Sequence, residues 1–175
     1  MTHDIRDLTA ADLEAHCEAL AGILWSCVQG GASVSFVLPF SRDEAAAFWE
    51  TRVFPAVQRG ETRLFGGFQD GQLAGTVQLC LGQPANQQHR ADVAKLLVHP
   101  EARRAGLGRA LMQVLEAEAR SCGKSLLLLD TRSGDPSQRL YESMGYQVAG
   151  SVPGFCRHPA EDRLESTTFL YKSLG

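Results

Sequence analysis

The chain has 175 residues and a formal net charge of −3, which fits one domain over residues 1–175 and gives no overall attraction to nucleic acid or to an anionic membrane. Its five cysteines are widely spaced and form no C-x-x-C pair, so they predict the reduced thiols of a cytoplasmic protein and no metal site. The amino terminus is polar and no apolar stretch approaches the length of a membrane span, so we expect neither a secretory signal nor a membrane anchor.

The amino-terminal residues predict a strand followed by a helix. Residues 4–8 can form a short strand, and Thr9 is suited to cap a helix. Apolar residues then recur every three or four positions as far as Cys27, which is the helical period. The glycine pair at 30–31 should end this helix.

A second helix should follow after a short loop. Ser41 and Glu44 have the spacing of a capping box, so the helix is expected to begin at about Arg42. Pro55 should kink this helix or end it.

The middle of the chain predicts three strands. Residues 63–68 and 73–81 form two β segments, and the Asp70-Gly71 pair between them is a strong hairpin signal. Residues 91–98 are a candidate for the third strand.

The last part of the chain alternates helices and strands. Residues 107–120 have the apolar spacing of an amphipathic helix. The continuous apolar run 126–129 predicts a strand that is covered on both faces, and a short helix over 136–144 should follow it. Two strands and a long loop between them complete the chain: 148–152, 167–171 and the loop 153–165.

This order of elements predicts the fold class. Strands and helices that alternate in this way indicate one α/β (α+β) domain, with a mixed, mostly antiparallel sheet of about seven strands and helices on both faces. No repeat, low-complexity tract or linker divides the chain.

The main functional signal is the segment 103–109, RRAGLGR, which lies between a predicted strand and an amphipathic helix. A helix start offers unpaired backbone N–H groups and the positive end of the helix dipole. Gly106 and Gly108 lack the side chains that would keep a diphosphate away from the backbone, and the three arginines add positive charge. The segment therefore predicts a site for an anion.

Other glycine loops fit this segment less well. A Walker loop requires G-K-[ST], but Arg109 and Ala110 follow Gly108. A dinucleotide fingerprint requires Gly or Ala where this chain has Leu111, and the other kinase signatures are absent. Taken alone, the glycines could also serve only a tight turn with solvated arginines.

Two segments together resemble the GNAT superfamily of acetyltransferases. The family motif R/Q-x-x-G-x-G/A is matched by Arg103, Gly106 and Gly108. Downstream, residues 140–146, LYESMGY, resemble the family segment L-Y-E-x-x-G-F. The resemblance implies a GNAT-like fold and acetyl-CoA as the co-substrate.

The resemblance also implies how the cofactor is held. The backbone of two strand residues would bind the thioester and pantetheine, on a strand splayed from its neighbour, and the N–H groups of residues 104–109 would hold the pyrophosphate. The cofactor-binding residues predicted in this way are Leu97, Val98, Arg103, Arg104, Ala105, Gly106, Leu107, Gly108 and Arg109.

A finer resemblance is to a tabtoxin-resistance subfamily of these enzymes. The matching segments are 29–36, 95–98, 129–131 and 152–156. The first and last of them lie outside the cofactor motif, so they indicate a particular subfamily. The chain departs from the broad superfamily pattern at Gly134 and Ser137, where Asn and Ala often stand.

Two residues are candidates for the chemistry, because acetyl transfer needs a neutral amine and a proton for the departing thiolate. The resemblance gives Tyr141 the role of protonating the thiolate; alternatively it is a core tyrosine bonded to backbone. Asp130 ends an apolar strand, where it can take the ammonium proton directly or through water, or instead cap the next turn. Lys95, on the preceding strand, receives no role.

The predicted function is acetyl-CoA-dependent transfer of acetyl to the amine of a small molecule, such as a toxin, an antibiotic or an amino acid. No cysteine or serine has a motif for a covalent acetyl-enzyme, which favours direct attack in a ternary complex. Loops near 30–36 and at 153–165 indicate a closed pocket. Alternatives are a protein N-terminal or lysine acetyltransferase, which needs an open groove, and a non-catalytic acetyl-CoA-binding regulatory module. Pairing through exposed strand edges could give a homodimer.

Overall fold

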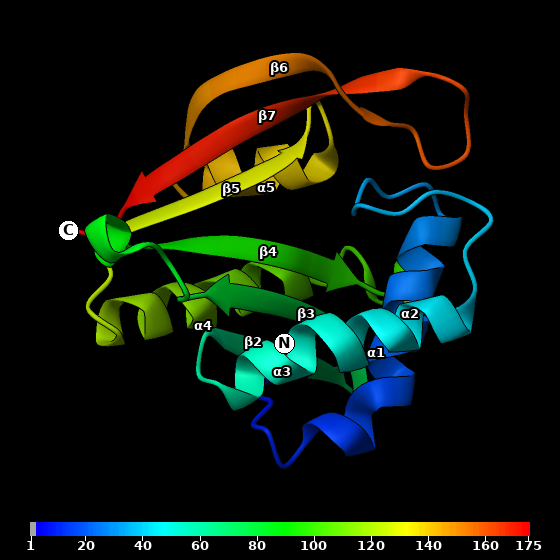
Figure 1. Cartoon of the computed structure of the whole chain (residues 1–175), viewed down its shortest axis with the longest axis horizontal. Coiled ribbons are helices and arrows are strands. Elements are labelled where there is room, and N and C mark those ends of the chain that lie inside the picture. The colour runs from blue at the N-terminus through cyan, green and yellow to red at the C-terminus, as the bar shows by residue number, and fades with distance from the viewer. Residues whose placement is uncertain (1–2) are drawn as a thin grey trace.

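The centre of the molecule is a seven-stranded sheet with the strand order β1-β2-β3-β4-β5-β7-β6 (Figure 1). The computed structural model describes residues 3–175. All neighbouring strands are antiparallel except β4 and β5, which are parallel. This confirms the mixed, mostly antiparallel sheet. The strands are β1 (Asp4–Asp7), β2 (Thr62–Gln69), β3 (Gln72–Cys80), β4 (Arg90–Val98), β5 (Leu126–Arg132), β6 (Gln147–Arg157) and β7 (Leu164–Ser173).

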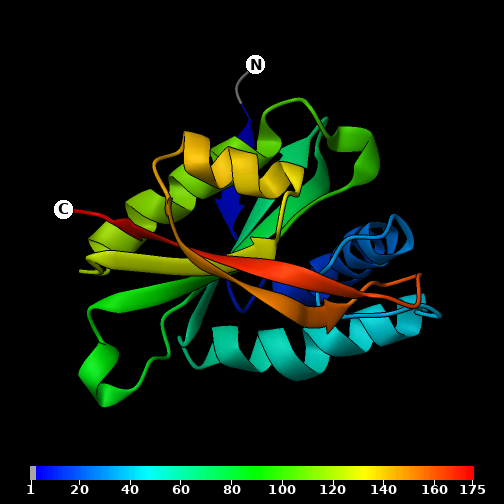
Figure 2. The same ribbon diagram turned by 90° about the horizontal axis from the view of Figure 1, so that it is seen from above.

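Helices lie on both sides of this sheet, as predicted (Figure 2). One side carries α4 (Leu107–Ser121) and α5 (Pro136–Ser143). The other carries α1 (Leu13–Gln29), α2 (Arg42–Phe48) and α3 (Phe54–Gln58), with the π-helical turn η1 (Trp49–Val53) joining the last two. No helix within residues 3–175 is both long enough and apolar enough to cross a membrane. Two short 3-10 turns, η2 (Ala85–Gln87) and η3 (Pro100–Ala102), flank β4.

Each side of the sheet has its own hydrophobic core. On the side of α4, Leu111 and Leu115 pack with Leu127, Leu129 and Leu170 of the strands. On the opposite side, the apolar residues of α1 and η1 pack on β2 and β4. The helix period of α4 and the strand period of β5 both place these leucines on one face, which is why the sequence predicted this packing well.

The second side of the sheet is covered only in part, which corrects the prediction that 126–129 is buried on both faces. Leu127 and Leu129 are buried, whereas Leu126 and Leu128 are only partly so. The second core contains β2, β3 and β4 residues but no described residue of β5, β6 or β7. One face of β5 and β7 is therefore open, and we refer to it as the open face.

The first helix begins later than predicted. The backbone N–H and the hydroxyl of Thr9 both donate to the carboxylate of Asp12, at 2.9 and 2.6 Å. Thr9 thus closes a turn with Asp12, and α1 starts only at Leu13. Thr9 has the residue type of a cap, but the carboxylate that follows it binds it locally instead.

The second helix begins where it was predicted. Ser41 and Glu44 form the reciprocal capping box, with the Glu44 N–H 3.1 Å from the Ser41 hydroxyl oxygen. The helix then widens into η1 directly before α3, and Pro55, in the first turn of α3, has no N–H to donate to a preceding carbonyl.

The predicted loop 153–165 is mostly strand. β6 runs to Arg157 and β7 starts at Leu164, so only residues 158–163 connect them. Pro153 lies where the pairing register shifts between Val152 and Cys156. β6 is an edge strand, and a bulge on an edge accepts a proline that cannot donate to a ladder.

Candidate active site

β4 and β5 separate along their length. Their pairing covers only Arg90–Asp92 and Leu126–Leu128, although β4 continues to Val98 and β5 to Arg132. Figure 1 shows the two strands side by side at one end and diverging toward their carboxyl ends. The two strands are therefore unpaired with each other beyond Asp92 and Leu128, and we refer to the region between their carboxyl-terminal parts as the gap.

The gap coincides with a bulge in β4. The register with β3 shifts between Thr76 and Gln78, and opposite this shift Lys95 has a left-handed backbone with φ of 50°. Left-handed non-glycine residues are uncommon and concentrate at functional sites. The bulge turns the end of β4 away from β5.

Leu97 and Val98 form the far end of the diverging strand. Leu97 is 2% exposed and packs in the second core. Val98 packs against the core on the α4 side. The Val98 carbonyl is occupied, because Arg103 Nε donates to it at 3.1 Å and the Cys27 thiol lies 3.5 Å away. Arg103 therefore ties the glycine loop to the end of β4.

The glycine loop presents a row of free N–H groups. Within residues 3–175, none of the backbone N–H groups of residues 104–109 donates a hydrogen bond. Gly106 caps α4 with φ of +83°, and Arg104 is also left-handed with φ of 65°. A helix start with unsatisfied donors is suited to a phosphate group, so residues 104–109, including Ala105, fit the pyrophosphate of acetyl-CoA.

Gly108 opens this loop toward the gap. A Cβ atom added at Gly108 would lie 3.5 Å from Leu140 Cδ2 and 3.8 Å from Val98 Cγ2. The absent side chain thus leaves free the space between β4 and α5, beside the N–H groups.

Leu107 has a packing role as well as a free N–H. Its side chain is 1% exposed. A Cβ added at Gly67 of β2 would lie only 2.7 Å from Leu107 Cδ1, and one at Gly75 of β3 would lie 3.1 Å from Leu107 Cδ2. The start of α4 is therefore seated in a depression that two glycines of the sheet create.

The three arginines of the loop differ in their contacts. Arg103 binds the Val98 carbonyl, and Arg109 Nη2 donates to the Ser143 hydroxyl of α5 at 2.7 Å. Arg104 is exposed and forms no side-chain hydrogen bond or ion pair with any residue from 3 to 175. Of the three, Arg104 has its charge available for a ligand.

Tyr141 lies in the α4-side core. It is 6% exposed and its ring packs against that of Tyr146 at 5.7 Å. Its hydroxyl has no hydrogen-bond partner in the described chain, so the alternative of a hydroxyl bonded to backbone does not apply. Burial, with the negative charges of Asp130 and Asp135, raises the pKa of Tyr141 above its usual value. The hydroxyl therefore keeps its proton at neutral pH.

Asp130 approaches the gap from the opposite side. It pairs with Phe169 of β7, and its side chain lies on the open face because Leu129 points into the core. Partial burial of the carboxyl raises the pKa of Asp130, Lys95 opposes this effect, and Asp92 adds to it.

Lys95 faces Asp130 across the gap, although the sequence analysis gave it no role. Burial lowers the pKa of Lys95, and the charge of Asp130 opposes this. Lys95 Nζ donates to Ser35 Oγ at 3.3 Å and lies 5.7 Å from the centroid of the Phe48 ring. A single lysine within the apolar run VAKLLV was the signal that could have drawn attention to it.

Comparisons with known proteins agree with this geometry. A model of the Acetyltransferase (GNAT) family matches residues 23–146. An uncharacterized N-acetyltransferase from the hisH-hisA intergenic region of Azospirillum brasilense is 34% identical over 153 residues, which are 86% of this chain and 84% of the relative. The L-amino acid N-acyltransferase MnaT of Escherichia coli (strain K12) is 39% identical over 57 residues, 32% of this chain and 33% of the relative.

A solved structure extends the similarity to the whole fold. The GNAT superfamily phosphinothricin acetyltransferase of Sinorhizobium meliloti, in complex with acetyl-CoA, superimposes with a TM-score of 0.78 at 22% identity, covering 100% of this chain and 90% of the other. The matched family model includes the glycine loop, α4, β5 and α5. The chain belongs to the GNAT family and is an acetyl-CoA-dependent N-acetyltransferase of that family.

Proposed function

We propose that the enzyme acetylates the amine of a small, amino-acid-like molecule by direct attack within a ternary complex. The observation that carries this proposal is the gap between β4 and β5, which has the free N–H groups of α4 and Tyr141 on one side and Asp130 with Lys95 on the other. The gap offers one place where a thioester and an amine can meet.

Each reacting group has a residue suited to it. Acetyl-CoA supplies the acetyl thioester, and residues 104–109 are suited to bind its pyrophosphate through their N–H groups. Asp130 can take the proton of the ammonium form of the acceptor, which frees the lone pair of the nitrogen for attack. Tyr141 can donate its proton to the thiolate that departs, and the second proton that the nitrogen loses as the amide forms restores the tyrosine hydroxyl. Lys95 holds a positive charge beside Asp130, which favours the carboxylate form needed for the first step.

Two loops favour a small acceptor over a protein. The α1–α2 loop, residues 30–41, meets the β6–β7 loop where the Leu38 N–H donates to the Pro159 carbonyl at 2.8 Å. A peptide would need an open groove across this contact. The names of two similar proteins, an L-amino acid N-acyltransferase and a phosphinothricin acetyltransferase, also support an amino-acid-like acceptor.

The resemblance of 29–36 and 152–156 to tabtoxin-resistance enzymes makes detoxification of an amino-acid-like toxin a specific form of this proposal. It is supported by the position of both segments, because Ser33 and Cys156 contact each other beside the open face at 3.4 Å. The alternative of a regulatory acetyl-CoA-binding module is disfavoured by the nearness of two groups suited to proton transfer, since the charge of Asp130 acts on Tyr141.

Release of free CoA measures the proposed reaction directly. Acetyl-CoA is incubated with the enzyme and a panel of L-amino acids, phosphinothricin, tabtoxinine-type amino acids, polyamines and peptides with free amino termini. We expect amine-dependent thiol release with one or more amino-acid-like acceptors. Release with peptides alone would favour the protein acetyltransferase, and binding of acetyl-CoA without release with any amine would favour the regulatory module.

A further inference from the structure

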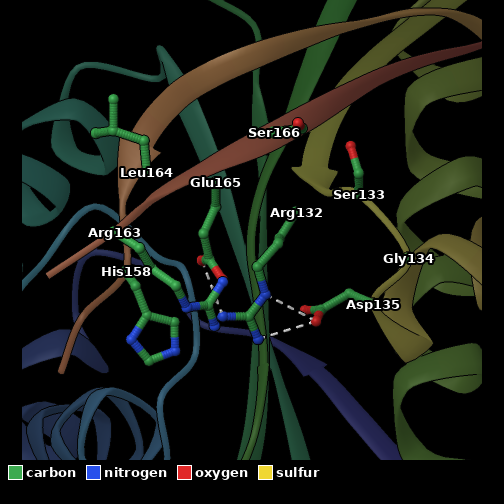
Figure 3. A pocket seen from close by; sticks show the side chains of 9 residues that line it. All are labelled: Arg132, Ser133, Gly134, Asp135, His158, Arg163, Leu164, Glu165 and Ser166. Atoms are coloured by element: carbon green, nitrogen blue, oxygen red, sulfur yellow. Dashed lines mark hydrogen bonds and ion pairs between the residues drawn. The ribbon is translucent and has the colours of Figure 1, made fainter. Parts of the chain in front are cut away.

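Arg132 connects several segments that surround the open face (Figure 3). At the end of β5, its Nη1 donates to the carbonyl oxygen of Gly31 at 3.0 Å and pairs with Glu165 Oε2 at 3.2 Å. Its Nε and Nη2 both contact Asp135 Oδ1, at 3.0 and 2.9 Å. One guanidinium thus joins the α1–α2 loop, β7 and the start of α5 to β5.

This guanidinium lies on the same face of the sheet as Asp130. Side chains two residues apart in a strand point to the same side, so Arg132 follows Asp130 along the open face. Glu165 is 8% exposed, and its second oxygen pairs with Arg163 Nη1 at 2.9 Å. Arg132, Asp135, Glu165 and Arg163 line a cavity of about 470 Å³. Carboxylates on two sides hold the Arg132 fork in the orientation that reaches Gly31.

Gly31, whose carbonyl accepts the hydrogen bond from Arg132, belongs to the same α1–α2 loop as Ser35, which bonds to Lys95. Gly31 has φ of +82°, and four residues further on Ser35, also left-handed with φ of 81°, accepts the hydrogen bond from Lys95. The loop therefore reaches the Asp130–Lys95 side of the gap, and its first part is fixed to the sheet at Gly31. Its position at Ser35 depends on where that first part is held.

We infer that Arg132 is a positioning residue for acceptor binding. It acts through the Gly31 carbonyl, which it holds so that residues 31–36 stay against the Lys95 side of the gap. Within residues 3–175 it forms no hydrogen bond or ion pair with the glycine loop or α4, so its main effect should be on the acceptor. Its bonds to Asp135 reach the start of α5, and the Arg132→Lys variant keeps a positive charge there. The inference rests on the proposed function only in taking the open face as the acceptor side.

Arg163 provides a matched control. It is an arginine bound to the same Glu165, and its other partner is Glu161 in the β6–β7 loop. Arg163→Met therefore removes one guanidinium from the same network without removing the bond to Gly31. Arg132→Lys is the conservative variant, since a lysine keeps a positive charge between Asp135 and Glu165 but lacks the fork that reaches the Gly31 carbonyl at the same time.

The first measurement is hydrogen–deuterium exchange of the free enzyme. We expect the amides of Gly31 and Ala32, which donate to the Val28 and Cys27 carbonyls, to exchange about tenfold faster in Arg132→Met and Arg132→Lys, the factor for loss of one charge-assisted hydrogen bond. Arg163→Met should leave them unchanged. Because no turnover is needed, this result stands even if no amine in the panel is acetylated. Unchanged exchange in Arg132→Lys, or equal acceleration in Arg163→Met, would overturn the inference.

The second measurement is steady-state kinetics with the L-amino acid that the wild-type enzyme acetylates fastest. We expect the KM for that amino acid to rise about tenfold in Arg132→Lys, with the KM for acetyl-CoA unchanged. A merely structural role would change both constants together or lower the amount of folded enzyme. Equal changes in both KM values would contradict the inference even if exchange were faster.

Discussion

Tyr141 is a buried residue whose protonated hydroxyl forms no hydrogen bond within residues 3–175, which suits a proton donor. We predict that Tyr141→Phe lowers kcat about 100-fold, the lower range for a positioned general acid, with little change in the KM for acetyl-CoA. The measurement is the pH dependence of thiol release. Full turnover of the variant at every pH would remove this role from Tyr141.

Tyr146 is a suitable control for that experiment. Its ring packs against Tyr141, and its hydroxyl is buried without a hydrogen-bond partner in the described chain. Tyr146→Phe removes an equivalent hydroxyl from the same core, so it should keep kcat and leave stability unchanged or slightly higher. A matching loss of kcat in both variants would point to disturbed packing instead.

Protonation of Asp130 should set how the enzyme's activity falls toward acidic pH. Partial burial raises the pKa of its carboxyl, and only the ionised form can accept a proton. We expect kcat/KM to fall as the pH drops through this raised pKa, at a higher pH than a fully solvated aspartate would give. Asp130→Asn should lower kcat and abolish this acid limb. If only the KM for the amine rose and the profile stayed the same, Asp130 would bind the amine without serving as its base.

At the scale of the elements, the packing of the start of α4 against β2 and β3 should affect the binding of the cofactor. Gly67→Ala would place a Cβ 2.7 Å from Leu107 Cδ1. We expect it to destabilise the fold by about 1–3 kcal/mol and to raise the KM for acetyl-CoA, because the start of α4 must shift. Thermal unfolding and kinetics measure the two effects.

Gly150→Ala controls for the general effect of replacing a strand glycine. A Cβ at Gly150 meets no atom within 4 Å, and this position lies on the edge strand β6. We expect a stability change within about 0.5 kcal/mol and no change in the KM for acetyl-CoA. If Gly67→Ala and Gly150→Ala had the same effects on stability and on the KM for acetyl-CoA, the packing of Leu107 against the sheet would not determine the position of the glycine loop.

The elements that the sequence predicted well are those set by local patterns. The capping box at Ser41, the Asp70-Gly71 hairpin and the apolar period of α4 each involve residues close in sequence, and all three appear in the structure. Pro153 was misread because a proline signals a loop unless the strand lies at an edge, and edge position depends on the whole sheet.

The candidate site, too, could be predicted only where it depends on residues close in sequence. The glycine loop is a local motif at a helix start, so its geometry could be predicted. The contacts of Lys95 with Ser35 and of Arg132 with Gly31 join residues 60 and 101 positions apart. No local pattern encodes such contacts, and the sequence analysis therefore assigned neither residue a role.

At the scale of the whole molecule, β6 is an unprotected edge. Val148, Val152 and Phe155 are 48%, 44% and 49% exposed. An exposed apolar edge strand favours pairing with a second copy, so we propose a homodimer through β6. Light scattering coupled to size exclusion should give a dimer for the wild-type chain and a monomer for Val152→Glu. A wild-type monomer at all concentrations would contradict this proposal.

We expect acetyl-CoA to bind at the start of α4 and in the adjoining gap. Gly108→Val adds two methyl groups beyond a Cβ that makes only ordinary contacts with Val98 and Leu140, and its unfolding temperature measures whether the fold persists. Isothermal titration with acetyl-CoA should show one site per chain in the wild-type enzyme and at least about tenfold weaker binding in Gly108→Val, with both proteins unfolding at similar temperatures. Equal affinity in the two folded proteins would contradict the claim.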